Sequence, residues 1–183
     1  PFIMFLYLRC NPYPLVFRCL KESGLTAFFT RSSAANIPVN MSLCEKLGLD
    51  KDMYSVSIPL GATINMDGTS LYQAVAAVFI SQALHIPLDF SDQLTIVLTA
   101  LLASIGSAAV PGAGMIMLVI VLESIGIPAD KLAVGIALIF AIDRPLDMCR
   151  TVINVTGDAM VSVVVAKSLG RLHPEDLLTT KNR

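Results

Sequence analysis

The chain has 183 residues, of which 55% are hydrophobic and only 15% charged, with a formal net charge of −1. A soluble domain usually carries about 25% charged residues, so this composition and a mean hydropathy of +0.71 indicate a membrane protein in contact with lipid. The small net charge excludes a basic nucleic-acid-binding surface, and we expect no nucleic-acid partner. The four cysteines lack any CxxC or Cys/His metal spacing, which favours free thiols.

The first 50 residues predict a re-entrant hairpin. Residues 1–8 are expected to end a preceding transmembrane helix, and 9–24 to form a cytoplasmic turn that leads into the hairpin. Within 25–50, a short apolar stretch is followed by the polar tip at 31–33, and then by Pro38, where a proline would open a second short helix. A soluble helix–turn–helix would give much the same pattern.

Residues 51–88 are long enough to cross a bilayer once, but the segment NMDGT interrupts them. Gly68 lowers helix propensity, and Asn65 and Asp67 offer the backbone competing hydrogen bonds, so we expect an unwound region there. Unwound backbone at membrane depth lines a cavity or is buried in protein, and its carbonyls are ready cation ligands. The alternative is a surface turn that joins two soluble helices.

Residues 89–126 predict a second re-entrant hairpin. No charged residue occurs from 93 to 122, yet GSAAVPGAG at 106–114 divides this run into two half-length arms. A phosphate-binding loop is excluded because no Lys-Ser/Thr follows Gly114.

Residues 127–168 predict a transmembrane helix with a polar stripe, followed by a cytoplasmic tail at 169–183. At about 100° per residue, five polar side chains of this helix fall within an arc of roughly 80°. They are Asp143, Asp147, Arg150, Asn154 and Asp158. An isolated pattern of this kind is commonly a solvent-facing helix, but ionisable residues at membrane depth mark substrate or ion pathways.

The order of hairpin, helix, hairpin and helix predicts an all-α membrane protein with an internal repeat, as in secondary transporters. Nine Lys and Arg residues would face the cytoplasm and only Lys131 the outside. This bias predicts a multi-pass protein of the cell (inner) membrane.

The polar residues predict two kinds of site. Arg150 suits a substrate carboxylate, Asp147 an ammonium group, and the region of Ser32 and Ser33 a second carboxylate, which describes a small acidic amino acid. Asp67 and Asp158 are left as hard-cation ligands, with Thr63, Asn65 and Ser104 as further oxygens. The alternative for Asp147 is a salt bridge to Arg31 across the hairpin tip.

Four segments resemble the dicarboxylate/amino acid:cation symporter family, the glutamate transporter homologues. They are TRSSAANIPV, PLGATINMDGT, SIGSAAVPGAG and DRPLDMCRTVINVTGD, and the resemblance covers about residues 1–170. It implies a mobile transport core that moves as an elevator against scaffold helices that would precede residue 1, within a homotrimer. It also implies that the second hairpin is the outer gate. Arg31 with Met148 resembles the prokaryotic arrangement.

The resemblance also implies the site residues. The substrate contacts would be Ser32, Ser33, Thr69, Val110, Gly112, Asp147, Arg150, Thr151 and Asn154. One Na⁺ site would use Gly61, Asn65, Asn154 and Asp158, another Thr63, Ser104, Ile105 and Ser107, and a third Asp67.

The leading hypothesis is a symporter core that couples uptake of glutamate, aspartate or a related dicarboxylate to Na⁺. The segment GLTAFFTRSSAANIPVNM instead resembles the serine/threonine branch, but Arg150 favours an acidic substrate, because a buried guanidinium without an anion costs several kcal/mol. A proton-coupled dicarboxylate symporter and a channel-like pore are further alternatives. An enzyme is not expected, since no nucleophile–base pair or G-x-S-x-G motif occurs.

Overall fold

The computed structural model describes residues 4–6, 9 and 11–172, and within these it contains helices and no strand. The helices in chain order are α2 (Tyr13–Cys19), the π-helical turn η1 (Leu20–Gly24), α3 (Leu25–Thr30), α4 (Ile37–Lys46), α5 (Lys51–Ile64), α6 (Asp67–Ala83), α7 (Phe90–Ile105), α8 (Ala113–Ser124) and α9 (Ala129–Ser168). The all-helical fold is confirmed for this part of the chain. The predicted helix end at 1–8 and tail at 169–183 lie largely outside the described residues.

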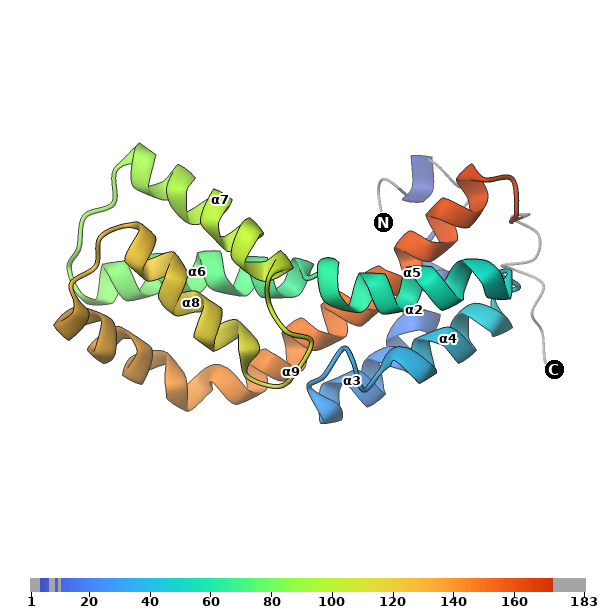
Figure 1. The fold of residues 1–183 in the computed structure, drawn as a ribbon, viewed down its shortest axis with the longest axis horizontal. Coiled ribbons are helices and arrows are strands. Elements are labelled where there is room, and N and C mark those ends of the chain that lie inside the picture. Colours follow the sequence, from blue (N-terminus) through green and yellow to red (C-terminus); the bar gives the residue numbers. More distant parts are fainter. Residues whose placement is uncertain (1–3, 7–8, 10, 173–183) are drawn as a thin grey trace.

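The long helix α9 is the axis of an elongated molecule (Figure 1). Its 40 residues run from one end to the other. Helices α6 and α8 pack against its first half, and α2, η1, α3, α4 and α5 against its second half. The polar stripe lies near the middle of α9, where the two groups of helices meet.

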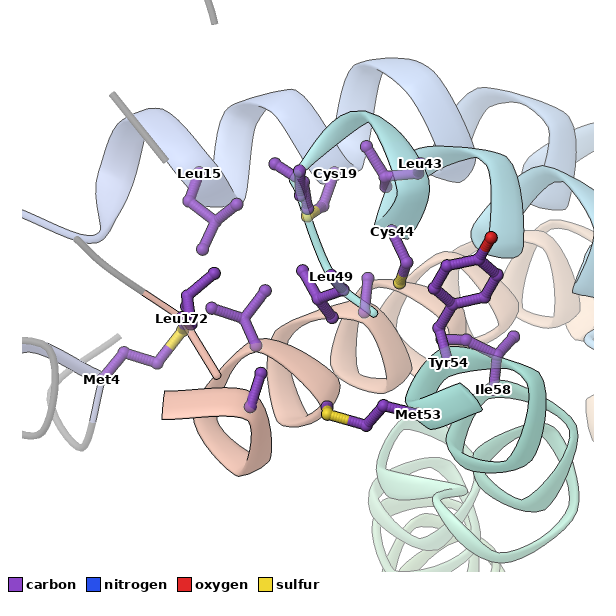
Figure 2. Packing of buried hydrophobic residues seen from close by; sticks show 14 residues of the cluster. Met4, Leu15, Cys19, Leu43, Cys44, Leu49, Met53, Tyr54, Ile58 and Leu172 are labelled. Carbon is purple, nitrogen blue, oxygen red and sulfur yellow. The ribbon is translucent and has the colours of Figure 1, made fainter. Parts of the chain in front are cut away.

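Each half has its own apolar core. In the second half, Leu43, Leu47, Ile58 and Val163 are fully buried, and Cys19 and Cys44 lie among them (Figure 2). The core of the first half is built by α6, α7 and α8 against α9, and includes Ile80, Leu118 and Leu122. These two cores hold the helices that carry the polar residues in fixed positions.

The predicted interruption at NMDGT is present but shorter than expected. Only Asn65 and Met66 leave the helical conformation, and Asp67 already begins α6. An aspartate in the first turn of a helix is stabilised by the helix dipole, which explains why α6 starts there. The region 51–88 therefore contains two separate helices of 14 and 17 residues.

Two helix–loop–helix pairs occupy the regions predicted as hairpins. Helices α3 and α4 are joined through 31–36, and α7 and α8 through 106–112. Arg31 ends α3 in the left-handed conformation (φ 54°), and Pro38 lies in the first turn of α4. Among the described residues, no helix combines the length and the apolar character needed to cross a membrane. Re-entry of these pairs into a bilayer stays a prediction.

Candidate functional site

The polar stripe of α9 is buried. Asp143, Asp147, Arg150, Asn154 and Asp158 are each between 2% and 6% exposed. The solvent-facing alternative for this helix is therefore wrong. Buried charges require partners, so the contacts of each residue define what the site can do.

A small pocket lies beside the stripe, between the tips of the two helix–loop–helix pairs and the start of α6. Its volume is about 20 Å³, which is room for about one water molecule. It is lined by Arg31, Ser33, Met66, Thr69, Ser107, Ala108, Ala109, Val110, Gly114, Asp147, Arg150, Thr151 and Asn154. Most of the predicted substrate residues thus surround one space.

The guanidinium of Arg150 has carboxylate partners within the chain. Its Nη2 lies 2.7 Å and its Nε 2.9 Å from Asp147 Oδ1, and its Nη1 lies 3.8 Å from Asp143 Oδ1. The guanidinium carbon also lies 4.5 Å from the centre of the Tyr72 ring, and the Tyr72 hydroxyl donates to Asp143 at 2.8 Å. Arg150 therefore has an anion within the chain, so a substrate carboxylate is not needed to balance its charge. Its Nη1 is buried without a hydrogen-bond partner among the described residues.

Asp147 also ties both loop tips to α9. Its second oxygen, Oδ2, accepts from the backbone N–H of Gly112 at 3.1 Å and lies 3.9 Å from Arg31 Nη1. Gly112 belongs to the second tip and Arg31 to the first. The salt bridge considered as the alternative for Asp147 is thus present, at the long end of the range for an ion pair.

Asn154 anchors the start of α6. Its Oδ1 accepts from the Gly68 N–H at 2.8 Å, and its Nδ2 donates to Thr69 Oγ1 at 3.1 Å. Thr151, one turn earlier on α9, donates its hydroxyl to the Asp147 carbonyl at 2.7 Å. The side-chain amide of Asn154 therefore faces the substrate pocket and the start of α6.

Asp158 forms a second polar cluster with the end of α5. Its Oδ1 accepts from Asn65 Nδ2 at 2.9 Å, and a side chain on Gly61 would place its Cβ only 2.7 Å from the same oxygen. The other oxygen, Oδ2, is buried without a hydrogen-bond partner among the described residues. A buried carboxylate oxygen without a partner fits a hard cation such as Na⁺, which prefers oxygen ligands.

The remaining predicted cation ligands are more dispersed. Thr63 and Asp67 are exposed, and Thr63 donates its hydroxyl to the Leu60 carbonyl at 2.9 Å. Ser104 and Ser107 are buried near the second tip, whereas the Ile105 side chain is largely exposed. Within the described part of the chain, no three His, Cys, Asp or Glu side chains gather in a way that could hold a metal ion.

Sequence reasoning did not place three residues that surround Arg150 and Asn154. Asp143 lies on the polar stripe one turn before Asp147, and its spacing alone does not indicate its contact with Arg150. Tyr72 lies one turn after Gly68 on α6, and the sequence contains no signal that its ring faces Arg150. Met66, whose sulfur lies 3.3 Å from Asn154 Nδ2, belongs to the predicted break.

Comparison with known proteins identifies a family and a curated relative. The Sodium:dicarboxylate symporter family matches residues 1–168. The serine/threonine transporter SstT of Bifidobacterium adolescentis is 47% identical over 158 residues, which are 86% of this chain and 37% of that protein. The chain thus spans little more than a third of the length of this relative. Both matches are transporters, as predicted, and not enzymes. The family match covers nearly the whole sequence, and the chain therefore belongs to the sodium:dicarboxylate symporter family.

Proposed function

We propose that this chain is the substrate- and ion-binding part of a Na⁺-coupled symporter for small neutral amino acids of the serine and threonine class. The observation that carries the proposal is the ion pair between Arg150 and Asp147, at 2.7 Å, inside the pocket. The similarity to a serine/threonine transporter supports the same class. The sequence alone favours an acidic substrate for Arg150, but in the structure Arg150 is paired with Asp147.

The charges around the pocket favour a zwitterion. Two cations, Arg31 and Arg150, are matched by two carboxylates, Asp143 and Asp147. A neutral amino acid adds no net charge to this balanced set. Aspartate would instead add a net negative charge to this set, with Arg150 Nη1, which is buried without a hydrogen-bond partner among the described residues, as the donor left to receive it.

The residues of the pocket suggest how a zwitterion would be held. Asp147 Oδ2 faces the tips and would accept from the substrate ammonium group. Ser33, Thr69 and Thr151 line the same space and would bond the substrate's hydroxyl and carboxylate groups. The present volume of about 20 Å³ is too small for an amino acid, so binding would require the tips that carry Ser32, Val110 and Gly112 to separate.

The coupling ion would bind next to the substrate. Asp158, Asn65 and the Gly61 backbone form the first candidate site, because Asp158 Oδ2 has no other partner among the described residues. Thr63, Ser104, Ile105 and Ser107 would supply a second site and Asp67 a third. Bound Na⁺ would neutralise Asp158 and so stabilise the end of α5 against α9.

The family also indicates where this chain would lie and how it would move in the full-length protein. We include in the proposal a multi-pass location in the prokaryotic cell membrane, two re-entrant hairpins at 25–50 and 89–126, and elevator movement against scaffold helices in a homotrimer. Membership in a family of membrane symporters supports the membrane location.

The test is uptake of radiolabelled serine into proteoliposomes that contain the full-length protein, with and without an inward Na⁺ gradient. We expect Na⁺-dependent serine uptake that an excess of threonine suppresses and an excess of aspartate does not. Suppression by aspartate would return the protein to the acidic-substrate class. Uptake driven by a proton gradient alone would favour the proton-coupled alternative, and a reversal potential that ignores the serine gradient would favour a channel.

A further inference from the structure

Three buried polar residues form a chain of hydrogen bonds behind the first tip. Ser23 of η1, Asn36 at the end of the tip and Asn40 within α4 are each no more than 1% exposed. Asn36 Nδ2 donates to Ser23 Oγ at 2.6 Å, and the Ser23 hydroxyl donates in turn to Asn40 Oδ1. Asn40 Nδ2 then donates to the carbonyl of Val155 on α9 at 2.9 Å. None of these four residues lines the substrate pocket.

One end of this chain holds the first tip. The backbone N–H of Asn36 donates to the carbonyls of both Ser32 and Ser33, each at 3.2 Å, and Ser33 lines the pocket. An asparagine just before a helix usually accepts a hydrogen bond from the first turn through its side chain. Asn36 makes no such cap on α4, and its side-chain amide bonds Ser23 instead. Asn36 thus joins the pocket wall to the interior.

The other end of the chain reaches a different wall of the pocket. Val155 directly follows Asn154, whose side-chain amide bonds the Gly68 N–H and the Thr69 hydroxyl at the start of α6. Asn154 and Thr69 both line the pocket. The three polar residues therefore connect the wall that carries Ser33 to the wall that carries Asn154.

The π-helical turn η1 brings Ser23 into this chain. Ser23 and Gly24 are both buried, and a Cβ on Gly24 would lie only 3.1 Å from Val152 Cγ1. The backbone of η1 therefore lies close against α9, and this approach keeps the Ser23 hydroxyl within reach of both asparagines. A π-helical turn inserted into a longer helix often occurs at a functional position.

Stability alone does not explain these residues. Asn36 Oδ1 is buried without a hydrogen-bond partner among the described residues, and an unpaired buried acceptor lowers stability. An apolar side chain would avoid this loss. Bonded polar groups in a protein interior, however, hold the elements that they join in one arrangement. The network therefore points to a requirement for a fixed geometry at the pocket.

We infer that Ser23, Asn36 and Asn40 are positioning residues, which fix the separation between Ser33 and Asn154 and so set the width of the pocket. The inference rests on the proposal that this pocket binds a small amino acid. The three residues act only through the first tip and α9. A substrate must bond both walls at once, so a displaced first tip lowers its affinity. Once the substrate is bound, its own contacts hold the tip, and the maximal rate does not depend on the network.

The experiment is Na⁺-dependent uptake of radiolabelled serine by the full-length protein in proteoliposomes. The KM and the maximal rate are measured for the wild type, Ser23→Ala, Asn36→Ala and the double variant. We expect the KM of each single variant to rise about tenfold, which corresponds to about 1.4 kcal/mol, the upper end of what one hydrogen bond contributes. The maximal rate should change little. The KM of the double variant should not exceed that of Ser23→Ala, because both substitutions break the same link.

Ser81→Ala is the matched control. It also removes a fully buried hydroxyl, but one that bonds the Ala77 carbonyl within α6, and it should leave the KM unchanged. An unchanged KM in Ser23→Ala and Asn36→Ala, whatever their unfolding temperatures, would overturn the inference, and so would additive increases in the double variant. If Ser23→Ala does not fold, the comparison of Asn36→Ala with Ser81→Ala decides.

Failure of the proposed function gives a different result. If the wild type takes up aspartate and not serine, the proposed substrate class is wrong, and the KM for aspartate in the same variants then decides whether the three residues position the tip. A wild type that takes up neither amino acid would overturn both proposals.

Discussion

Ser32, in the loop between α3 and α4, donates its hydroxyl to the carbonyl of Ala109, in the loop between α7 and α8, at 2.8 Å. The backbone N–H of Ala34 donates to the same carbonyl at 3.2 Å. These bonds join two tips that are 77 residues apart in the sequence, directly beside the substrate pocket. The structure therefore shows the pocket closed, and access to it requires these bonds to break.

Locking the two tips together should stop transport. In a background where the exposed Cys149 is replaced by serine, the pair Ala34→Cys and Ala109→Cys should form a disulfide under mild oxidation, because the two backbones are in direct contact. Na⁺-dependent uptake should fall by an order of magnitude or more and return on reduction. The two single variants are the controls, and continued uptake by the fully cross-linked pair would show that the tips need not separate.

Asp147 should matter for folding as well as for binding. Asp147→Asn removes the main charge partner of a buried guanidinium, and breaking a buried ion pair in this way costs about 3–5 kcal/mol. The double variant Asp147→Asn, Arg150→Met should be much less destabilised than the sum of the two single variants. Unfolding temperatures of all four proteins in one detergent measure this coupling, and additive losses would mean that the pair contributes nothing.

Several features of the fold were predictable because each depends on a local pattern. The break between α5 and α6 follows from Asn65, and the start of α4 from Pro38. The single helix α9 follows from its apolar flanks and the 3.6-residue spacing of its polar stripe. The contact between Ser32 and Ala109 was not predictable, because it depends on the three-dimensional packing of two separate helix pairs and leaves no periodic signal.

A side chain at Gly61 should weaken Na⁺ binding. In Gly61→Ala the new methyl group would approach Asp158 Oδ1 to 2.7 Å and displace the carboxylate. We expect the Na⁺ concentration for half-maximal uptake to rise by about tenfold, with little change in the maximal rate at saturating Na⁺. Ser55→Ala, on an exposed position of the same helix, is the matched control. An unchanged Na⁺ dependence would remove Asp158 from the ion site.

Glu22 should make the stability of the first helix pair depend on pH. Partial burial raises the pKa of Glu22, but hydrogen bonds from Lys46 and Arg18 outweigh this effect and hold the pKa below its ordinary value of 4.5. A carboxyl group whose pKa is lower in the folded state stabilises that state above pH 4.5, and this contribution is lost as the pH falls through the folded-state pKa.

The unfolding temperature of the wild type should therefore exceed that of Glu22→Gln at pH 6, and the difference should shrink as the pH falls below 4.5. High concentrations of choline chloride should also reduce the difference, because Lys46 is largely exposed and its attraction to Glu22 is screened by salt. A difference that stays constant from pH 6 to pH 3.5 would show that the carboxylate charge has no part in stability.

The sequence predicts which residues form the candidate site, but it does not predict which of them form ion pairs with one another. Asp147, Arg150, Thr151 and Asn154 lie on one helix, so their shared face follows from their spacing. The partner of Arg150 depends on which rotamers the surrounding helices allow, and the sequence offered both Asp147 and a substrate carboxylate. The structure gives Arg150 internal partners, and this difference moves the proposed substrate from acidic to neutral.

The most direct test of the proposed function is binding of L-serine and L-aspartate to the purified full-length protein by isothermal titration calorimetry, in NaCl and in choline chloride. Our account predicts that serine binds in NaCl only, and that saturating aspartate leaves the serine affinity unchanged, because Arg150 remains paired with Asp147. Tighter binding of aspartate than of serine in NaCl would show that the substrate displaces Asp147 from Arg150, and would contradict the proposal.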